Sequence, residues 1–363
     1  MKNTLGNSVA VTLFGESHGA EIGAVIDGLA AGITVDEEYI AKKLTLRRPA
    51  GAISTARAEK DPFRIVSGVF NGKTTGTPIC ILIPNGDTKS KDYSATRFLP
   101  RPGHADYSAY KKYHGFEDYR GGGHFSGRIT AALVAAGAIA EKALEAKGIA
   151  IGTHIKACAG VTDTEFTDIK KDIAYLNDKV FAVLDEDTED KMKRAIEAAA
   201  KDGDSVGGIL ESAVVGLPAG VGEPWFDSLE STLSHGLFSI PAVKGVEFGE
   251  GFAFADMRGS KANDPFAIYE GRVVTKTNHN GGINGGISNG MPLIIRCVVK
   301  PTPSIYKEQD TVDMKDGTEE KLQIQGRHDP AIVHRARVVA DSVIALVLCD
   351  MLALKYGTDF LGE

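Results

Sequence analysis

Short apolar runs recur along the chain and are separated by polar, glycine-rich stretches. They are rich in Val and Ile and are bounded by Gly, Asn, Asp or Pro, a pattern typical of β-strands. The predicted strands are residues 8–14, 23–26, 64–70, 78–83, 208–215, 245–248 and 293–299. Strands and helices do not alternate regularly along the chain, so a doubly wound parallel sheet is not expected.

Helical periodicity is clearest in two longer stretches, residues 129–147 and 331–356, each followed or closed by a glycine. Asp329 followed by Pro330 fits the N-cap and first position of the second helix. Short strands mixed with a few long helices predict an α+β fold. We expect residues 1–363 to form one intertwined domain.

Two stretches are predicted to be peripheral to that domain. Residues 161–205 are acidic and polar, with a surface helix at 189–201. Residues 307–323 are highly charged and contain Asp316–Gly317, a dipeptide that favours a tight turn, so we expect a protruding hairpin there.

Composition and charge argue against nucleic-acid-binding, membrane and secreted proteins. The chain has 363 residues, of which 43% are hydrophobic, so it can bury a large core. Its net charge of −7 argues against nucleic acid or an anionic membrane as a partner. Residues 1–14 lack the pattern of a signal peptide, and the apolar runs are too short or too interrupted to span a bilayer.

Cysteine usage points to a reducing compartment. The four cysteines lie far apart and form no CxxC pair, which favours buried free thiols over a disulfide framework or a zinc site. They are Cys80, Cys158, Cys297 and Cys349. We therefore expect a cytoplasmic protein without a bound metal.

Two segments carry histidines in glycine-containing surroundings. Residues 15–19 (Gly-Glu-Ser-His-Gly) place His18 directly after a predicted strand, where it could serve catalysis or simply occupy a tight turn. Residues 101–107 place an arginine, His104 and an aspartate close together, which suits proton transfer near neutral pH. A polar turn explains the second segment about equally well.

Residues 119–128 read Tyr-Arg-Gly-Gly-Gly-His-Phe-Ser-Gly-Arg and lead into the predicted helix at 129–147. Free N–H groups and the helix dipole make such a start attractive to anions. Arg120 and Arg128 flank the glycines and strengthen this interpretation. The phosphate-binding pattern GxxxxGK[ST] is absent.

Three further segments complete the set. Arg47 and Arg48, followed by proline, and nearby Arg57 are predicted on a loop, where they could clamp phosphate or carboxylate or form a solvated basic surface. Residues 278–290 are dominated by Gly and Asn, as in a loop ordered by a flat polar cofactor or in a flexible surface loop. Residues 326–330 open the last helix and include a carboxylate that could move protons.

Together and in this order, the six segments resemble the chorismate synthase family. The match runs from residues 15–19 to residues 326–330, and the phrases at 67–70, 73–78 and 243–247 also resemble it. The resemblance implies an anti 1,4-elimination of phosphate from 5-enolpyruvylshikimate 3-phosphate, giving chorismate. This lyase reaction is the last common step of the shikimate pathway, which leads to the aromatic amino acids. It requires reduced FMN although it makes no net redox change.

The resemblance also implies an architecture and partners. The family fold is a single-domain β-α-β sandwich with antiparallel strands around a helical core, assembled as a homotetramer. A chain of this bacterial, monofunctional type receives reduced FMN from an external flavin reductase. No nucleic acid or membrane partner is implied.

Site residues follow from the same resemblance. The implied catalytic residues are His18 as proton donor near the departing phosphate, His104 near the flavin, and Asp329 near flavin N5. The implied substrate ligands are the arginines Arg47, Arg48, Arg57, Arg128 and Arg327. The implied flavin contacts are His124, Phe125, Ser126, Pro241, Ala242, Gly285, Lys300, Pro301, Thr302, Pro303, Ser304 and Arg327.

Some positions depart from the usual family pattern. Ala52 and His124 stand where arginines are common, which removes permanent charges from the regions implied to contact NADP and the flavin phosphate. Pro241 and Pro303 replace a common Asn and Ser. Two alternatives therefore stay open: a flavin-binding homologue that has lost the elimination, and a non-catalytic binder of nucleic acid, which the acidic total disfavours.

Overall fold

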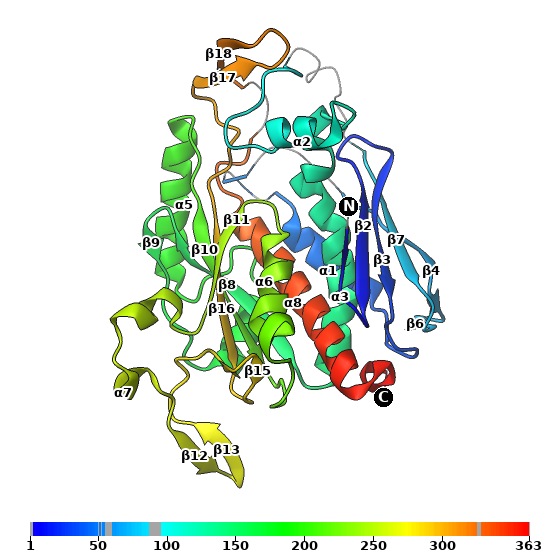
Figure 1. Cartoon of the computed structure of the whole chain (residues 1–363), viewed down its shortest axis with the longest axis vertical. Helices are drawn as coiled ribbons and strands as arrows, with labels where there is room; N and C mark the ends of the chain where they lie inside the picture. The colour runs from blue at the N-terminus through cyan, green and yellow to red at the C-terminus, as the bar shows by residue number, and fades with distance from the viewer. Residues whose placement is uncertain are drawn as a thin grey trace.

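The computed structural model describes residues 3–49, 51, 53–54, 60–86, 96–324 and 328–362. Two five-stranded sheets enclose a layer of helices, so the chain forms a β-α-β sandwich of the α+β class (Figure 1). All strand pairs within the two sheets are antiparallel. The predicted fold class is confirmed.

The first sheet, at the right of Figure 1, is built mainly from the N-terminal part of the chain. Its strands in spatial order are β1 (Thr4–Leu5), β2 (Ala10–Gly15), β3 (Glu21–Asp27), β7 (Ile79–Pro84) and β4 (Arg64–Ser67). In β7 the buried residues alternate with half-buried ones, because successive side chains point to opposite faces of the sheet.

The second sheet lies on the other side of the helices. Its strands in spatial order are β11 (Val243–Phe248), β16 (Leu293–Val299), β10 (Gly208–Val215), β8 (Ala150–Cys158) and β9 (Val161–Thr162). Four two-stranded ribbons complete the described strands. They are β5 (Val69–Phe70) with β6 (Lys73–Thr74), β12 (Phe266–Tyr269) with β13 (Arg272–Thr275), β14 (Ile283–Asn284) with β15 (Ile287–Ser288), and β17 (Gln309–Asp313) with β18 (Thr318–Leu322).

Helices α1 (Glu37–Arg47), α3 (Thr130–Ala146), α6 (Leu229–Phe238) and α8 (Val333–Tyr356) lie between the two sheets (Figure 1). The other described α-helices are α2 (Asp106–Tyr113), α4 (Ile169–Leu176), α5 (Glu186–Lys201) and α7 (Gly259–Ala262). The 3-10 turns are η2 (Arg120–Phe125), η3 (Gly127–Ile129), η4 (Trp225–Asp227), η5 (Gly251–Asp256) and η6 (Thr358–Leu361).

Helices α3 and α8 form the centre of the core, and nearly all their side chains are buried. A Cβ placed on Gly137 of α3 would lie only 2.2 Å from the Cβ of Ser342 on α8. The two helices can therefore approach this closely only because position 137 has no side chain.

A row of charged side chains crosses the second sheet. His154 on β8 hydrogen-bonds Asp163 at 2.7 Å and Glu211 on β10 at 3.0 Å, and Arg296 on β16 pairs with Glu211 at 3.0 Å and with Glu247 on β11 at 2.6 Å. Burial opposes protonation of His154. The hydrogen bonds to its two carboxylate partners outweigh that effect and raise the pKa of His154 above its ordinary value.

Most predicted elements are found close to their predicted bounds. The strands predicted at 208–215 and 293–299 match β10 and β16. The run predicted at 64–70 is divided between β4 and β5 by Gly68, which has φ 81. Here a Cβ would lie 2.6 Å from the backbone of β7, so the close approach of the two chains requires glycine.

Two local predictions were wrong. Helix α8 begins at Val333 with Ile332 as N-cap, and that N-cap makes no side-chain hydrogen bond. Asp329 is therefore not the N-cap, and its carboxylate pairs with Arg335 instead. Arg47 does not lie on a loop, because it is the last residue of α1, and Arg48 is the C-cap.

The hairpin predicted within residues 307–323 is confirmed as β17–β18, and the helix predicted at 189–201 is present as α5. All four cysteines are free thiols; three are buried and Cys80 is half-buried. In the part of the chain that the structure describes, no helix combines the length and apolar character needed to cross a membrane.

Candidate active site

A turn of three consecutive glycines lies at the centre of the predicted site residues. Gly121, Gly122 and Gly123 all have positive φ, at 58, 82 and 53°, in the segment that leads towards α3. A Cβ on Gly121 would lie 2.4 Å from Cε1 of His18, and a Cβ on Gly122 would lie 3.1 Å from Cε1 of His104. Because they have no side chains, neighbouring glycines thus leave room for two histidines that are far apart in the sequence.

The His18 loop is fastened to this turn by backbone contacts. Ser17 N donates to Gly123 O at 3.0 Å, and Nδ1 of His124 donates to Gly15 O at 2.7 Å. The His18 side chain is almost completely buried at the end of β2. The described contact of His124 is therefore with the His18 loop, a link that the sequence did not reveal.

His104 is held by a carboxylate and an arginine from its own segment. Its Nδ1 lies 2.6 Å from Asp106 Oδ1, and Arg101 binds the same carboxylate through Nε at 2.7 Å and Nη2 at 2.8 Å. Burial raises the pKa of Asp106, but hydrogen bonds from Arg101 and His104 prevail and hold it well below its ordinary value. Asp106 is therefore an acceptor, and Nδ1 of His104 carries the proton.

This tautomer leaves Nε2 of His104 facing Gly122, where an added Cβ would lie 3.3 Å away. In this tautomer Nε2 has a lone pair, so it can accept a proton or a hydrogen bond. The sequence prediction that residues 101–107 bring an arginine, a histidine and a carboxylate together is confirmed.

Residues that the resemblance assigns to the flavin lie beside the same cluster. Lys300 Nζ donates to Gly103 O, and its backbone N–H donates to Ala242 O at 2.9 Å. Ser304 accepts from Arg101 Nη1 at 3.4 Å. Segment 300–304 therefore adjoins residues 101–106, and Ala242 contacts this segment at Lys300.

Two buried polar atoms in this region, Oγ1 of Thr302 and Nε2 of His328, have no hydrogen-bond partner among the described residues. His328 also adjoins the region, with its ring 5.3 Å from that of Tyr306. Burial and the positive charge of Arg101 lower the pKa of His328, so its ring is neutral near pH 7.

Gly285 does not join this group. It lies in the turn between β14 and β15, where the backbone of neighbouring Gly286 accepts from Leu229 at the start of α6. Ala242 follows the other end of that helix, which has 10 residues and is therefore about 15 Å long.

The Gly- and Asn-rich loop at 278–290 is organised by a carboxylate from outside it. Asp264 accepts from the backbone of His279 at 2.8 Å and Asn280 at 2.9 Å, and from Thr277 Oγ1 at 2.7 Å. Burial opposes its ionisation, but these hydrogen bonds lower the pKa of Asp264 to about 2. The Asp264 carboxylate thus holds the first residues of the loop in place.

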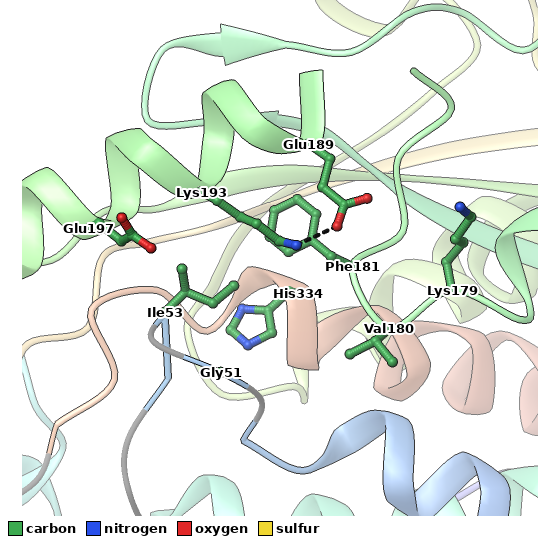
Figure 2. A pocket seen from close by; sticks show the side chains of 9 residues that line it. All are labelled: Gly51, Ile53, Lys179, Val180, Phe181, Glu189, Lys193, Glu197 and His334. Atoms are coloured by element: carbon green, nitrogen blue, oxygen red, sulfur yellow. Dashed lines mark hydrogen bonds and ion pairs between the residues drawn. The ribbon is translucent and has the colours of Figure 1, made fainter. Parts of the chain in front are cut away.

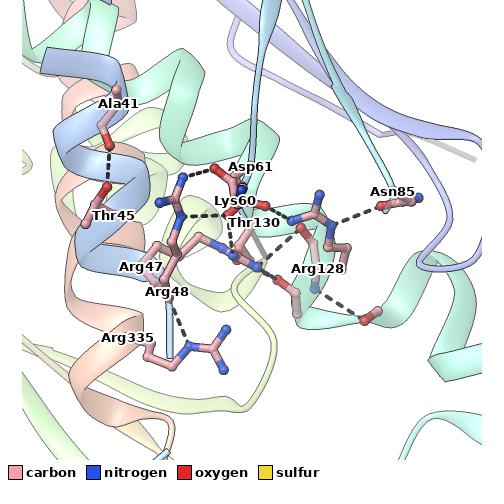
Figure 3. Close-up of polar contacts among 12 residues, drawn as sticks. Ala41, Thr45, Arg47, Arg48, Lys60, Asp61, Asn85, Arg128, Thr130 and Arg335 are labelled. Atoms are coloured by element: carbon pink, nitrogen blue, oxygen red, sulfur yellow. Dashed lines mark hydrogen bonds and ion pairs between the residues drawn. The ribbon is translucent and has the colours of Figure 1, made fainter. Parts of the chain in front are cut away.

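A cluster of arginines lies beside the start of α3 (Figure 3). Arg47, Arg48 and Arg128 converge on Asp61, whose side chain is fully buried. Arg128 also donates to Asn85 Oδ1 at 3.0 Å, and the Asn85 amide in turn donates to two carbonyls of the His18 loop. Asp61 and Asn85 were not predicted from the sequence, since single polar residues beside a strand carry no distinguishing signal.

Asp329 is joined to this cluster through the first turn of α8. Arg335 binds the Asp329 carboxylate through Nη1 and donates from Nε to Arg47 O at 2.9 Å. Arg57 and Arg327, which were predicted to bind substrate, lie outside the described residues, as does Ala52.

A separate cavity of about 340 Å³ lies between α5 and the start of α8 (Figure 2). It is lined by Ile53, by Lys193 of α5 and by His334 of α8, among others. His334 hydrogen-bonds Ser54 at 2.8 Å, and burial lowers the pKa of His334 to about 3. None of the predicted catalytic residues lines this cavity.

Comparisons with known proteins agree on one family. A family model described as chorismate synthase matches residues 9–353. The chorismate synthase of Pyrococcus abyssi is 48% identical over 350 residues, covering 96% of this chain and 97% of the relative. That of Chitinophaga pinensis is 48% identical over 353 residues, covering 97% of each chain.

A solved crystal structure of chorismate synthase superposes with a TM-score of 0.75 at 29% identity, covering 98% of this chain and 94% of that chain. Sequence and fold therefore lead to the same assignment over nearly the full length. The chain belongs to the chorismate synthase family of lyases.

Proposed function

We propose that the chain eliminates phosphate from 5-enolpyruvylshikimate 3-phosphate by an anti 1,4-elimination, giving chorismate, and that it requires reduced FMN. Membership of the family supports the reaction class. The observation that carries the proposal is the placing of His18 and His104 on adjacent glycines of one turn. Two imidazoles fixed so close along one backbone segment suit a reaction that moves a proton at each of two centres.

The substrate carries a phosphate and two carboxylates, and the arginines are its proposed ligands. Arg47, Arg48 and Arg128 converge on one point in the described part of the chain, while Arg57 and Arg327 are proposed from the sequence resemblance alone. Guanidinium groups both bind such anions and stabilise the negative charge that grows on the departing phosphate.

The proposed proton transfers divide between three residues. His18 donates a proton near the leaving phosphate. His104, oriented by Asp106, holds its Nε2 lone pair towards the site. Asp329, paired with Arg335, is the proposed acceptor in the relay that removes the ring proton of the substrate. The charged neighbours of His104 and Asp329 fix the direction of both groups before substrate binds.

The residues of the described chain fit a flavin. The unsatisfied Oγ1 of Thr302, the Ser304 hydroxyl and the Lys300 ammonium lie in one segment beside His104, and they offer the donors that the polar ring edge and phosphate of FMN require. The proposed contacts also include His124, Phe125, Ser126 and residues 241–242. When bound, a reduced flavin supplies electron density transiently and recovers it, so no net redox change results.

Gly285 is the proposed flavin contact with least support, since α6 separates it from the others. We also propose that reduced FMN comes from an external reductase, that the protein is cytoplasmic, and that it forms a homotetramer. The exposed apolar side chains of the β12–β13 ribbon, Phe266, Ile268 and Val273, support self-association.

Single-turnover measurements on histidine variants test the proposal. His18→Ala and His104→Ala should each slow chorismate formation at saturating substrate, while binding of oxidised FMN, followed by flavin fluorescence, and binding of substrate stay near wild type. Variants that lose ligand binding but keep the single-turnover rate would contradict the catalytic roles. Flavin binding without any turnover by the wild-type chain would favour a homologue that has lost the elimination.

A further inference from the structure

Asp61 lies where three arginines meet, just before β4 (Figure 3). Its side chain has no exposed surface, and the side chains of Arg47 and Arg128 are only 4% and 3% exposed. Arg48 is 29% exposed and forms the outer side of the cluster. In this conformation the carboxylate itself fills the place where an anionic ligand would contact all three guanidinium groups.

The two carboxylate oxygens of Asp61 are bound very differently. Oδ1 accepts directly from Arg128 Nη1. Oδ2 lies 3.5 Å from Arg47 Nη1 and 3.8 Å from Arg48 Nε, beyond hydrogen-bond distance, and it has no hydrogen-bond partner among the described residues. The attraction to Arg47 and Arg48 is thus Coulombic without directed bonds, so another anion can replace it.

The backbone at Asp61 is also unusual. Its φ of 44° lies in the left-handed region, which residues other than glycine seldom adopt, and the following residue is Pro62. The side-chain contacts with the arginines hold this conformation in place. Release of Asp61 from the cluster would therefore relieve backbone strain.

The arginines keep their direction through neutral groups as well. Arg47 donates to Thr130 Oγ1 at 2.9 Å and to Gly127 O at 3.0 Å, and Arg128 donates to Asn85 Oδ1 at 3.0 Å. These contacts do not involve the carboxylate. The guanidinium groups of Arg47 and Arg128 would therefore remain aimed at the same point after the carboxylate leaves, which is the condition for a preorganised anion site. Arg48 donates to Lys60 O, beside Asp61.

We propose that Asp61 stands in for the phosphate of the ligand and is displaced when a phosphate group binds to Arg47, Arg48 and Arg128. A phosphate dianion carries more charge and more acceptor oxygens than a carboxylate, so it satisfies three guanidinium groups more fully. The inference rests on the proposed function only for the identity of the anion as phosphate. Asp61 is a positioning residue, because it keeps the cluster assembled until the ligand arrives.

The test measures binding of inorganic phosphate by isothermal titration calorimetry at low ionic strength. Asp61→Asn removes the internal competitor and keeps the shape of the side chain, so phosphate should bind more tightly than to wild type. If Asp61 has left the arginines in about a tenth of the wild-type molecules, the gain in affinity is at least about tenfold. Asp178→Asn makes the same change of charge at an ion-paired side chain that is 77% exposed and should leave phosphate affinity unchanged. Equal or weaker phosphate binding by folded Asp61→Asn would overturn the proposal.

A second measurement uses the wild-type chain and does not depend on the folding of a variant. Hydrogen–deuterium exchange of residues 60–67 should become faster when phosphate is added, because Asp61 is released. Slower or unchanged exchange would instead mean a fixed counter-ion and would refute the inference. Turnover of wild type is measured separately, so failure of the proposed reaction and failure of this inference can be told apart.

Discussion

Replacing Gly121 by alanine tests whether the glycine turn positions His18. The added Cβ would lie 2.4 Å from Cε1 and 2.6 Å from Nδ1 of that ring. Atoms in contact rest about 3.5–4.0 Å apart, so the imidazole would have to retreat by about 1 Å. His18 is nearly buried, so this shift must also disturb the neighbouring loop.

A displacement of about 1 Å is expected to reduce kcat about 100-fold, which corresponds to about 2.7 kcal/mol of transition-state stabilisation. The KM for substrate should change little, because the arginine cluster is not touched. Alanine at φ 58° should also lower the free energy of unfolding by about 1–2 kcal/mol. Steady-state kinetics with reduced FMN under anaerobic conditions, together with thermal unfolding, measure both effects.

Gly127→Ala is the matched control, because it lies in the same segment and an added Cβ would meet nothing within 4 Å. It should keep both kcat and the melting temperature. If folded Gly121→Ala retained a kcat within about twofold of this control, the turn would not position His18 for catalysis and the reasoning would fail.

Three further predictions concern stability. The raised pKa of His154 means that its protonated form stabilises the fold fully below the ordinary value of 6.5, and that this contribution is lost as pH rises through the folded-state value. Melting temperatures of wild type should therefore fall more steeply above pH 6.5 than those of His154→Gln, and parallel curves would contradict this. Asp350→Ala should lower the free energy of unfolding, measured in urea, by about 3 kcal/mol, because Asp350 accepts hydrogen bonds from the backbone N–H groups of residues 7–9 at 2.6–3.0 Å. A loss below about 1 kcal/mol would refute that role. Gly137→Ala should lower the free energy of unfolding by about 2 kcal/mol, despite the better helix propensity of alanine, because the added Cβ would clash with Ser342. An unchanged urea midpoint would show that α3 and α8 can move apart freely.

The elements that could be predicted from sequence are those that a local pattern specifies. Strands β10 and β16 were located at their observed bounds because buried apolar runs ended at clear turn residues. Helix α1 was not predicted, since its charged residues mask a narrow apolar face. The N-cap assigned to Asp329 failed because its carboxylate is engaged by Arg335, a contact that exists only once α8 has folded.

In the candidate site too, local contacts could be predicted from the sequence and contacts between distant segments could not. The arrangement of Arg101, His104 and Asp106 was predicted because all three lie within one short segment. The meeting of His18 with Gly121 depends on the packing of β2 against the glycine turn, and no local pattern encodes it. The family resemblance is confirmed over residues 9–353, and it supplied the candidate residues without supplying their contacts.

The elimination itself is the most direct test of the central claim. Purified chain, reduced FMN and 5-enolpyruvylshikimate 3-phosphate would be mixed without oxygen, and chorismate absorbance, released phosphate and flavin absorbance would be followed together. We predict one chorismate and one phosphate for each substrate consumed, with the flavin still reduced at the end and no product with oxidised FMN alone. Phosphate release without chorismate, or stoichiometric oxidation of the flavin, would contradict the account.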